Sequence, residues 1–314
     1  MHTTNFFYLE HHVFEYFFDL KSYRCIKRIM TTVGLVYDLA RKDEKMIVNA
    51  LNNAGAKVKL IDSRREYFTL SKEEKKDEDV DIYYQRSISY FRALYFNYIL
   101  EKLLEAKVVN SYETYLLCGN KLLATVNFVK NEIPTPKTSI SFDADSALEA
   151  MNKQGFPLVL KPIFGSWGRL IAPLNDLESA KAIVETRQMM HPIYQIYYIQ
   201  ERIKNLQRDL RVVVVGDKPI AAEYRYATNG EWRTNLAKGG KAVKAEITEE
   251  VEKIVGKIVK AFGKGVYGVD FMESERGLLV HEVNPNVEFK GVSEASGIDV
   301  AKEIADYLLK EAKR

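Results

Sequence analysis

Two oxygen-rich segments near the C-terminal end of the chain carry the clearest chemistry. GVDFMES (268–274) and LLVHEVNPN (278–286) are predicted to form a hairpin with its turn near Arg276. In that register Asp270 faces Glu282, with about 5 Å between their Cβ atoms. Asn284 shares the face of Glu282, whereas His281 and Val283 project from the other face, because strand side chains alternate. Two carboxylates and an amide oxygen form an all-oxygen set that suits Mg²⁺, which usually leaves room for substrate phosphates.

The alternative for this hairpin is an exposed turn whose carboxylates are simply solvated. The run Asn284-Pro285-Asn286 argues against it, because Asn and Pro are poor strand residues without a local reason. A magnesium site beside a nucleotide therefore accounts for the hairpin better.

A second segment has the composition of a phosphate site. Lys161 ends an apolar strand and precedes a loop in which small residues let backbone N–H groups approach phosphate oxygens. Arg169 adds a further donor, while a solvent-facing role stays equally open for Lys161. Neither a GxxxxGK[ST] loop nor a GxGxxG after the first strand is present, which disfavours the usual nucleotide folds. The candidate loop residues are Gly165, Ser166, Trp167, Gly168 and Arg169.

Composition limits the classes of partner. The chain has 314 residues, and 46 Lys and Arg against 43 Asp and Glu leave a net charge of +3, too small to favour nucleic acid. Its apolar runs are shorter than the roughly 20 residues of a membrane span, so no membrane association is expected. Two cysteines, Cys25 and Cys118, are too few for a disulfide framework, which favours a reducing cytoplasm.

The elements that must position these residues form an α/β pattern. We expect residues 1–30 to be an N-terminal extension, with Met30 as a candidate native start, because the βαβ pattern begins directly after it. A first α/β domain is expected over 31–113, a central sub-domain over 114–197 and a C-terminal sub-domain over 198–314. In the first domain we expect strands over 33–37, 56–62 and 80–85 and helices over 44–54 and 91–104. In the second we expect a hairpin of strands 159–161 and 170–173, followed by a helix over 177–190. In the third we expect strands over 211–215 and 220–226, followed by the hairpin that carries Asp270 and Glu282.

Arg86 and Ser87 follow the third strand of the first domain, where α/β sheets generally bind ligands. An arginine there can clamp a substrate carboxylate with two parallel hydrogen bonds. A structural helix start is an equally open interpretation of Ser87. A separate basic set is a candidate for steering an acidic partner, with a solvated loop as the alternative; its members are Arg233, Lys238, Lys241 and Lys244.

Taken in order, these segments resemble the ATP-grasp ligases. The matching motifs are GNKLLAT with Lys121, LVLKPIFGSWGR with Lys161, YYIQERI, RDLRVVVVGD, WRTNLAKGGK, GVDFMES and LLVHEVNPNVEFKG. Within that superfamily the chain is similar to the RimK-like branch, and most closely to the LysX and ArgX ligases. The resemblance implies the α/β ATP-grasp fold, with three sub-domains and ATP between the central and C-terminal ones.

The resemblance also implies a reaction. Those enzymes join the α-amino group of glutamate or 2-aminoadipate to the C-terminal glutamate of LysW, a small acidic carrier protein, through an acyl phosphate, in arginine or lysine biosynthesis. The implied cofactors are ATP and two Mg²⁺ ions, and the implied assembly is a homodimer or homotetramer. Gly291, after the EFK tripeptide, favours glutamate, because aminoadipate-handling members often carry Asn there.

The residue roles follow from the same resemblance. Lys121 and Lys161 would hold ATP phosphates, and the linker Gln200-Glu201 would meet adenine and ribose. Asp209 and Arg211 would lie near the nucleotide and the acyl phosphate, with a weak surface ion pair as the alternative. Arg225 and Asn235 would stabilise the tetrahedral intermediate, because a cation and an amide donor suit a developing oxyanion. Asp270, Glu282 and Asn284 would bind the metal ions, and Arg86, Ser87 and Asn286 the substrate.

Two other functions remain open as alternatives to the carrier-protein ligase. One is a RimK-type glutamate ligase that acts on a coenzyme or on a ribosomal protein, which differs only in the acceptor. The other is a nucleotide-sensing module without turnover, against which the complete Asp270, Glu282 and Asn284 set argues.

Overall fold

The computed structural model describes residues 30–165, 168–204, 208–227 and 241–314. Met1–Met30 and Thr31–Arg314 form two separate units, and the fold described below is that of the second. The predicted N-terminal extension lies outside the described residues except for Met30.

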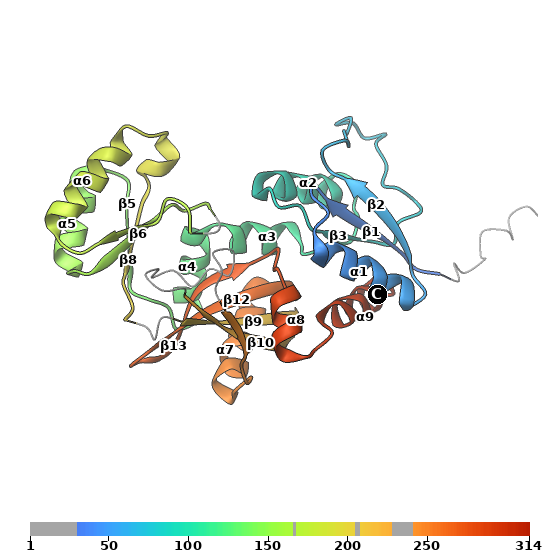
Figure 1. Ribbon diagram of the computed structural model, residues 1–314. Helices are drawn as coiled ribbons and strands as arrows, with labels where there is room; N and C mark the ends of the chain where they lie inside the picture. Colours follow the sequence, from blue (N-terminus) through green and yellow to red (C-terminus); the bar gives the residue numbers. More distant parts are fainter. Residues whose placement is uncertain (1–29, 166–167, 205–207, 228–240) are drawn as a thin grey trace, which may run out of the picture. The chain divides into compact units, whose positions relative to one another are not determined.

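The first part of the fold is a parallel sheet with the strand order β2-β1-β3-β4 (Figure 1). The predicted βαβ pattern is confirmed, with boundaries displaced by one or two residues. Asp38, directly after β1, accepts hydrogen bonds from the backbone N–H groups of Ile88 and Ser89 and so fixes the start of α2. The bounds are β1 Thr32–Tyr37, α1 Lys42–Asn53, β2 Lys57–Asp62, β3 Ile82–Gln85, α2 Tyr90–Lys102 and β4 Val108–Val109.

The second sheet is antiparallel, with the order β5-β8-β6-β7, and has its own apolar core against α5 and α6. The predicted hairpin corresponds to β6 and β7. β8 pairs with both β5 and β6, so this sheet continues to Glu201, past the expected boundary at residue 197. The bounds are β5 Thr138–Ser141, α5 Ala144–Gln154, β6 Leu158–Lys161, β7 Ala172–Leu174, α6 Leu177–Gln188, a 3₁₀ turn Pro192–Gln195 and β8 Tyr197–Glu201.

The third sheet is also antiparallel, in the order β11-β10-β9-β12-β13. Asp270 pairs with Glu282, as the hairpin register predicted. The strands are β9 Arg208–Gly216, β10 Lys218–Tyr226, β11 Lys241–Lys244, β12 Gly265–Ser274 and β13 Gly277–Asn284. The helices around it are α3 Tyr112–Gly119, α4 Lys121–Lys130, α7 Glu249–Phe262, α8 Lys290–Ser296 and α9 Val300–Ala312.

The two faces of β9 serve different purposes. Leu210, Val212 and Val214 pack with buried residues of α7 in one core. Val213 and Val215 point the other way, into a core shared with β1, α1 and α9. Asp209 and Arg211 continue that second face beyond the apolar stretch, because strand side chains alternate. The third sheet therefore packs at one end of this face and carries charge at the other.

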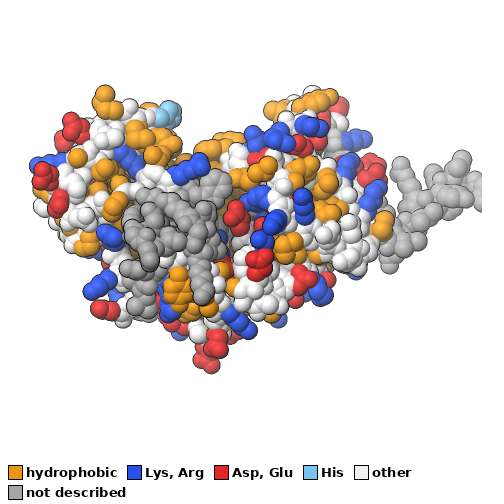
Figure 2. All heavy atoms as spheres, viewed as in Figure 1, with side chains coloured by type: hydrophobic (Ala, Val, Ile, Leu, Met, Phe, Trp, Pro, Cys, Tyr) orange, Lys and Arg blue, Asp and Glu red, His pale blue; other side chains and the backbone are white. Residues whose placement is uncertain are grey.

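The surface agrees with the small net charge. On the face shown in Figure 2, basic and acidic side chains are interspersed over the described residues. Among those residues, each helix is too short or too polar to cross a membrane.

Candidate functional site

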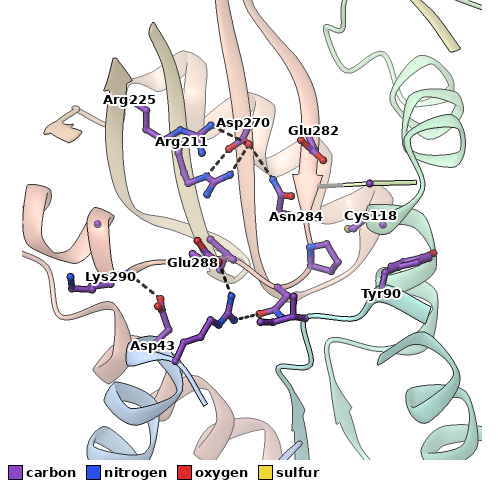
Figure 3. Close-up of a pocket in the computed structure, with 18 of the residues that line it drawn as sticks. Asp43, Tyr90, Cys118, Arg211, Arg225, Asp270, Glu282, Asn284, Glu288 and Lys290 are labelled. Atoms are coloured by element: carbon purple, nitrogen blue, oxygen red, sulfur yellow. Dashed lines mark hydrogen bonds and ion pairs between the residues drawn. The ribbon is translucent and has the colours of Figure 1, made fainter. Parts of the chain in front are cut away.

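A cavity of about 380 Å³ lies over the charged end of the third sheet (Figure 3). Its wall combines strand residues of that sheet with residues of the first sheet's loops and of the segment after β13. The lining residues that carry charge or an amide are Arg41, Asp43, Arg211, Glu223, Arg225, Asp270, Glu282, Asn284, Asn286, Glu288 and Lys290.

A row of five charged residues crosses the whole third sheet. The strand registers pair Lys244 with Glu223, Glu223 with Arg211, Arg211 with Asp270, and Asp270 with Glu282. Cross-strand partners share one face of a sheet. Four of the five, all except Lys244, line the cavity.

Two arginines hold the carboxylates of Asp209 and Asp270, on the face of the third sheet that we call the cavity floor, in place. Arg211 donates two hydrogen bonds to Asp270, at 2.8 and 2.7 Å, and Arg225 donates two to Asp209, at 2.7 and 2.6 Å. Arg225 also lies 3.2 Å from Asp270. Burial opposes the charge of Asp270, but the two arginines outweigh it and lower the pKa of that carboxyl. Asp209 and Arg211 were predicted to lie together near the nucleotide, and each makes a double hydrogen bond with a different residue.

Asp270, Glu282 and Asn284 come together as predicted. The Asn284 amide donates to Asp270 at 3.1 Å, and Glu282 accepts from Lys121 at 3.1 Å. Within the described residues there is no group of three His, Cys, Asp or Glu side chains able to hold a metal ion. The donor set is two carboxylates and one amide oxygen, which fits Mg²⁺ completed by phosphate oxygens.

The two predicted phosphate lysines both lie near this cluster. Asn120 caps α4 by accepting from the N–H groups of Leu122 and Leu123, which makes Lys121 the first helical residue. Its ammonium donates to the carbonyl of Gly165 at 2.8 Å. Lys161 donates to the Gln200 side chain at 2.6 Å. Burial, followed by the charge of Lys121, lowers the pKa of Lys161 to about 8.

Two glycines of the predicted phosphate loop have positive φ angles. Gly165 and Gly168 adopt φ values of 143° and 66°, which residues other than glycine rarely adopt. Gly165 and Gly168 line the cavity, and Arg169 is exposed beyond them. Ser166 and Trp167 lie outside the described residues, as does Asn235.

Gln200 is buried, whereas the neighbouring Glu201 faces outward. The Gln200 amide donates to Thr138 and to the Tyr198 hydroxyl, both at 3.0 Å, while its oxygen accepts from Lys161. Glu201 accepts from the backbone N–H of Lys137 at 2.6 Å. Gln200 therefore fixes the position of Lys161.

The predicted substrate clamp takes a different form. The Arg86 side chain is fully buried, bonded to Glu44 at 3.0 Å and to the carbonyl of Val287 at 2.9 Å. Ser87 is equally buried against Ser63. Asn286, which lines the cavity, donates to the backbone carbonyls of Arg86 and Ser87 at 3.0 and 2.9 Å. The three predicted residues do meet, but the Arg86 and Ser87 side chains stabilise the fold and do not reach the cavity.

Three residues at the site had not been identified from the sequence. Arg41, from the start of α1, reaches Glu288 at 2.7 Å and lines the cavity. His281 is an extra residue in β13, at the point where the pairing with β12 shifts register. Burial, followed by the charge of Lys161, lowers the pKa of His281 to about 4.

Glu223, the third residue, has a side chain that is 1% exposed. Burial raises the pKa of Glu223 to about 7, although Arg211 and Arg225 oppose this shift.

A signal for Glu223 was present in the sequence. It interrupts the apolar run Ile220-Ala221-Ala222 of a predicted strand, two residues before Arg225. Alternation puts these two charges on one face.

Comparisons with known proteins identify the family of the chain. Residues 118–308 match the RimK-like ATP-grasp domain, and residues 33–117 match the LysX preATP-grasp domain. The chain is 35% identical over 276 residues to the α-aminoadipate–LysW ligase LysX of Saccharolobus solfataricus, covering 87% of this chain and 98% of that one. It is 34% identical over 278 residues to the glutamate–LysW ligase ArgX of Sulfolobus acidocaldarius, covering 88% and 97%.

A solved structure gives the same result for the fold. The crystal structure of the RimK domain protein ATP-grasp from Sphaerobacter thermophilus superposes with a TM-score of 0.73 at 25% identity, covering 89% of this chain and 100% of that one. The predicted ATP-grasp fold is confirmed. The chain therefore belongs to the RimK-like family of ATP-grasp ligases, enzymes that form C–N bonds with ATP and typically Mg²⁺.

Proposed function

We propose that this enzyme joins the α-amino group of glutamate or 2-aminoadipate to the C-terminal glutamate of a LysW-type carrier protein. The relatives named LysX and ArgX, which the chain matches over nearly their whole length, support this acceptor and these two amino acids. The observation that carries the chemistry is the contact of Lys121 with Glu282, 3.1 Å apart at the edge of the charged row. It joins a cation suited to phosphate with a carboxylate suited to Mg²⁺.

The metal would be held by Asp270, Glu282 and Asn284, and we propose two ions. Bound Mg²⁺ would neutralise the charge that develops on the phosphate oxygens. Lys121 and Lys161 would hold the ATP phosphates from the side of the central sheet, and the loop from Gly165 to Arg169 would cover them. Gln200 would maintain the position of Lys161, and Glu201 would meet the ribose.

The proposed reaction has two steps. The carrier's terminal carboxylate attacks the γ-phosphoryl group of ATP, which gives an acyl phosphate and ADP. The amine of the amino acid then attacks that carbonyl carbon and displaces phosphate. Positioning and charge neutralisation supply the catalysis, without a protein nucleophile. Arg225, with Asn235, would stabilise the tetrahedral oxyanion, because its guanidinium is buried and held in a fixed orientation by Asp209.

Glutamate and 2-aminoadipate differ by one methylene group, and both are proposed as substrates. Gly291, the residue that favours glutamate, lines the cavity and adds no side chain to it. Arg41, before α1, and Asn286, after β13, would face the amino acid. A cytoplasmic location and a homodimeric or homotetrameric assembly are further parts of the proposal.

The test is ADP release by the purified protein with ATP, Mg²⁺, a LysW-type carrier ending in glutamate, and each amino acid separately. The mass of the carrier is measured in the same reactions. A gain equal to one glutamate residue or one aminoadipate residue supports the proposal and assigns the substrate. ADP release without any gain in carrier mass points to another acceptor, such as a coenzyme or a ribosomal protein. No ADP release with any acceptor supports a nucleotide-sensing module.

A further inference from the structure

Glu223 occupies an unusual place in the charged row. Its side chain is 1% exposed and lines the cavity, yet its Oε2 has no hydrogen-bond partner within the described part of the chain. A buried carboxylate oxygen without a partner costs free energy, so its retention points to a ligand that supplies the missing donor.

The charges around Glu223 leave a cation missing. On strands β9, β10 and β12 the face of the sheet below the cavity carries three carboxylates, Asp209, Glu223 and Asp270, but two guanidinium groups, Arg211 and Arg225. Both arginines already make double hydrogen bonds to Asp209 and Asp270. Lys244, the cross-strand neighbour of Glu223 on β11, carries an exposed side chain. Glu223 is thus the buried anion for which these arginines provide no direct hydrogen bond.

The row also fixes where the missing cation must lie. Glu223 on β10 is separated from Asp270 on β12 by β9, that is by two strand spacings of about 4.8 Å each. Asp270 and Glu282 belong to the metal and phosphate end of the row, on the far side of Arg211 (Figure 3). A cation bound by Glu223 would therefore lie apart from the proposed metal site, on the other side of Arg211.

We propose that Glu223 binds the ammonium group of the incoming amino acid and holds its nitrogen for attack on the acyl phosphate. This inference rests on the proposed function, since it concerns the second step of that reaction. An ammonium group supplies both the positive charge and the N–H donor that Oε2 lacks. Burial raises the pKa of Glu223 to about 7, and a bound ammonium group would lower it again, because opposite charges stabilise one another.

The step balances without a further reactant. The ammonium group loses one proton to water, and the resulting amine keeps an N–H directed at Glu223. The nitrogen lone pair forms the C–N bond, the bond between the acyl carbon and the phosphate oxygen breaks, and the second proton leaves with hydrogen phosphate.

The test compares two ligands that differ in the amine alone. Binding of glutamate and of glutarate is measured by calorimetry, in the presence of Mg²⁺ and a non-hydrolysable ATP analogue. The wild-type protein is expected to bind glutamate at least tenfold more tightly than glutarate. In Glu223→Gln, which has the same shape, this preference is expected to disappear through weaker glutamate binding, because a hydrogen bond to a charged group is lost. The same comparison is made with 2-aminoadipate and adipate.

The matched control is Glu246→Gln, an exposed glutamate that follows β11. It should keep the preference of the wild type. Glu223→Asp retains the charge and should keep part of the preference, which separates loss of the carboxylate from misfolding. The inference is overturned if Glu223→Gln still prefers glutamate, or if the wild type binds both ligands equally.

The carrier assay distinguishes this inference from the proposed function. If the carrier gains mass but Glu223→Gln keeps its preference, the inference alone fails. If the carrier gains no mass while Glu223→Gln loses the preference, the acceptor is wrong and Glu223 still binds the ammonium group.

Discussion

Arg225 on β10 contacts Asp270 on β12 across the intervening strand β9, with 3.2 Å between Nη2 and Oδ2. The same guanidinium makes two hydrogen bonds to Asp209 on β9. One side chain therefore links three strands of the cavity floor. Its positive charge is fixed in direction before any ligand arrives, which is the arrangement that stabilises a developing negative charge most effectively.

Replacing Arg225 with Met should therefore affect both stability and turnover. The buried Asp209 would lose both hydrogen bonds from Arg225, so the free energy of unfolding should fall by about 3–5 kcal/mol. ADP release should fall at least 100-fold. Urea unfolding and the ADP assay measure the two effects. The control is Lys264→Met, which removes an ion pair with Asp217 whose two side chains are half-exposed, and which should change stability by about 1 kcal/mol or less. Equal stability losses in the two variants would contradict this account of Arg225.

Glu282→Gln should raise the Mg²⁺ requirement. The change removes a carboxylate from the predicted metal site and also the partner of Lys121. The Mg²⁺ concentration that gives half-maximal ADP release should rise about tenfold or more, because Mg²⁺ binds an amide more weakly than a carboxylate. Glu273→Gln, on the same hairpin but paired with Arg208, is the control and should leave the Mg²⁺ titration unchanged. Coinciding titrations for Glu282→Gln and the wild type would remove Glu282 from the metal site.

Nucleotide affinity should depend on pH through Lys161. Burial, with the nearby charge of Lys121, lowers the pKa of Lys161 to about 8, while Glu282 opposes the shift. The lysine is therefore charged below pH 8 and loses its proton as the pH rises above that value. ADP affinity should fall roughly tenfold between pH 7 and pH 9, since one pKa unit corresponds to a factor of ten. Calorimetric titrations of the wild type and of Lys161→Gln measure this, and a parallel decline in both would exclude Lys161 as the titrating group.

Two glycine substitutions should change stability in opposite directions. A Cβ at Gly119 would overlap the ring of Tyr90, which packs against Tyr115 and Phe164. Gly119→Ala should therefore cost about 1–3 kcal/mol, as overpacked sites do. A Cβ at Gly256, inside α7, meets open space, so Gly256→Ala should add about 0.5–1 kcal/mol of helix stability. Thermal unfolding followed by circular dichroism measures both changes in stability. Destabilisation by Gly256→Ala would contradict the prediction that a Cβ at this position stabilises α7.

The sequence predicted the site best where local rules apply. Asp270 faces Glu282 as the predicted hairpin register required, although the turn pairs Ser274 with Gly277 and the extra residue at His281 restores the predicted pairing. The position of Lys161 at a strand end followed from the apolar run before it in the same way.

Long-range partners could not be predicted by those rules. Arg86 was expected to bind a carboxylate, and it does, but the carboxylate is that of Glu44, 42 residues earlier in the chain. The pairing of Arg225 with Asp209 depends on the register of two strands, which neither residue type reveals alone. The extra residue at His281 likewise depends on the pairing with the partner strand, which alternation along one strand does not reveal.

The core shared by the two ends of the described fold restricts how the enzyme can be recombined with its relatives. Leu35 and Ile47 of the first part pack in one cluster with Ile304 and Leu308 of α9. A cut between them leaves apolar surface exposed on both pieces. A chimeric ligase that takes its N-terminal region from another family member must also take α9 from the same donor, so such a graft requires two separate segments of sequence.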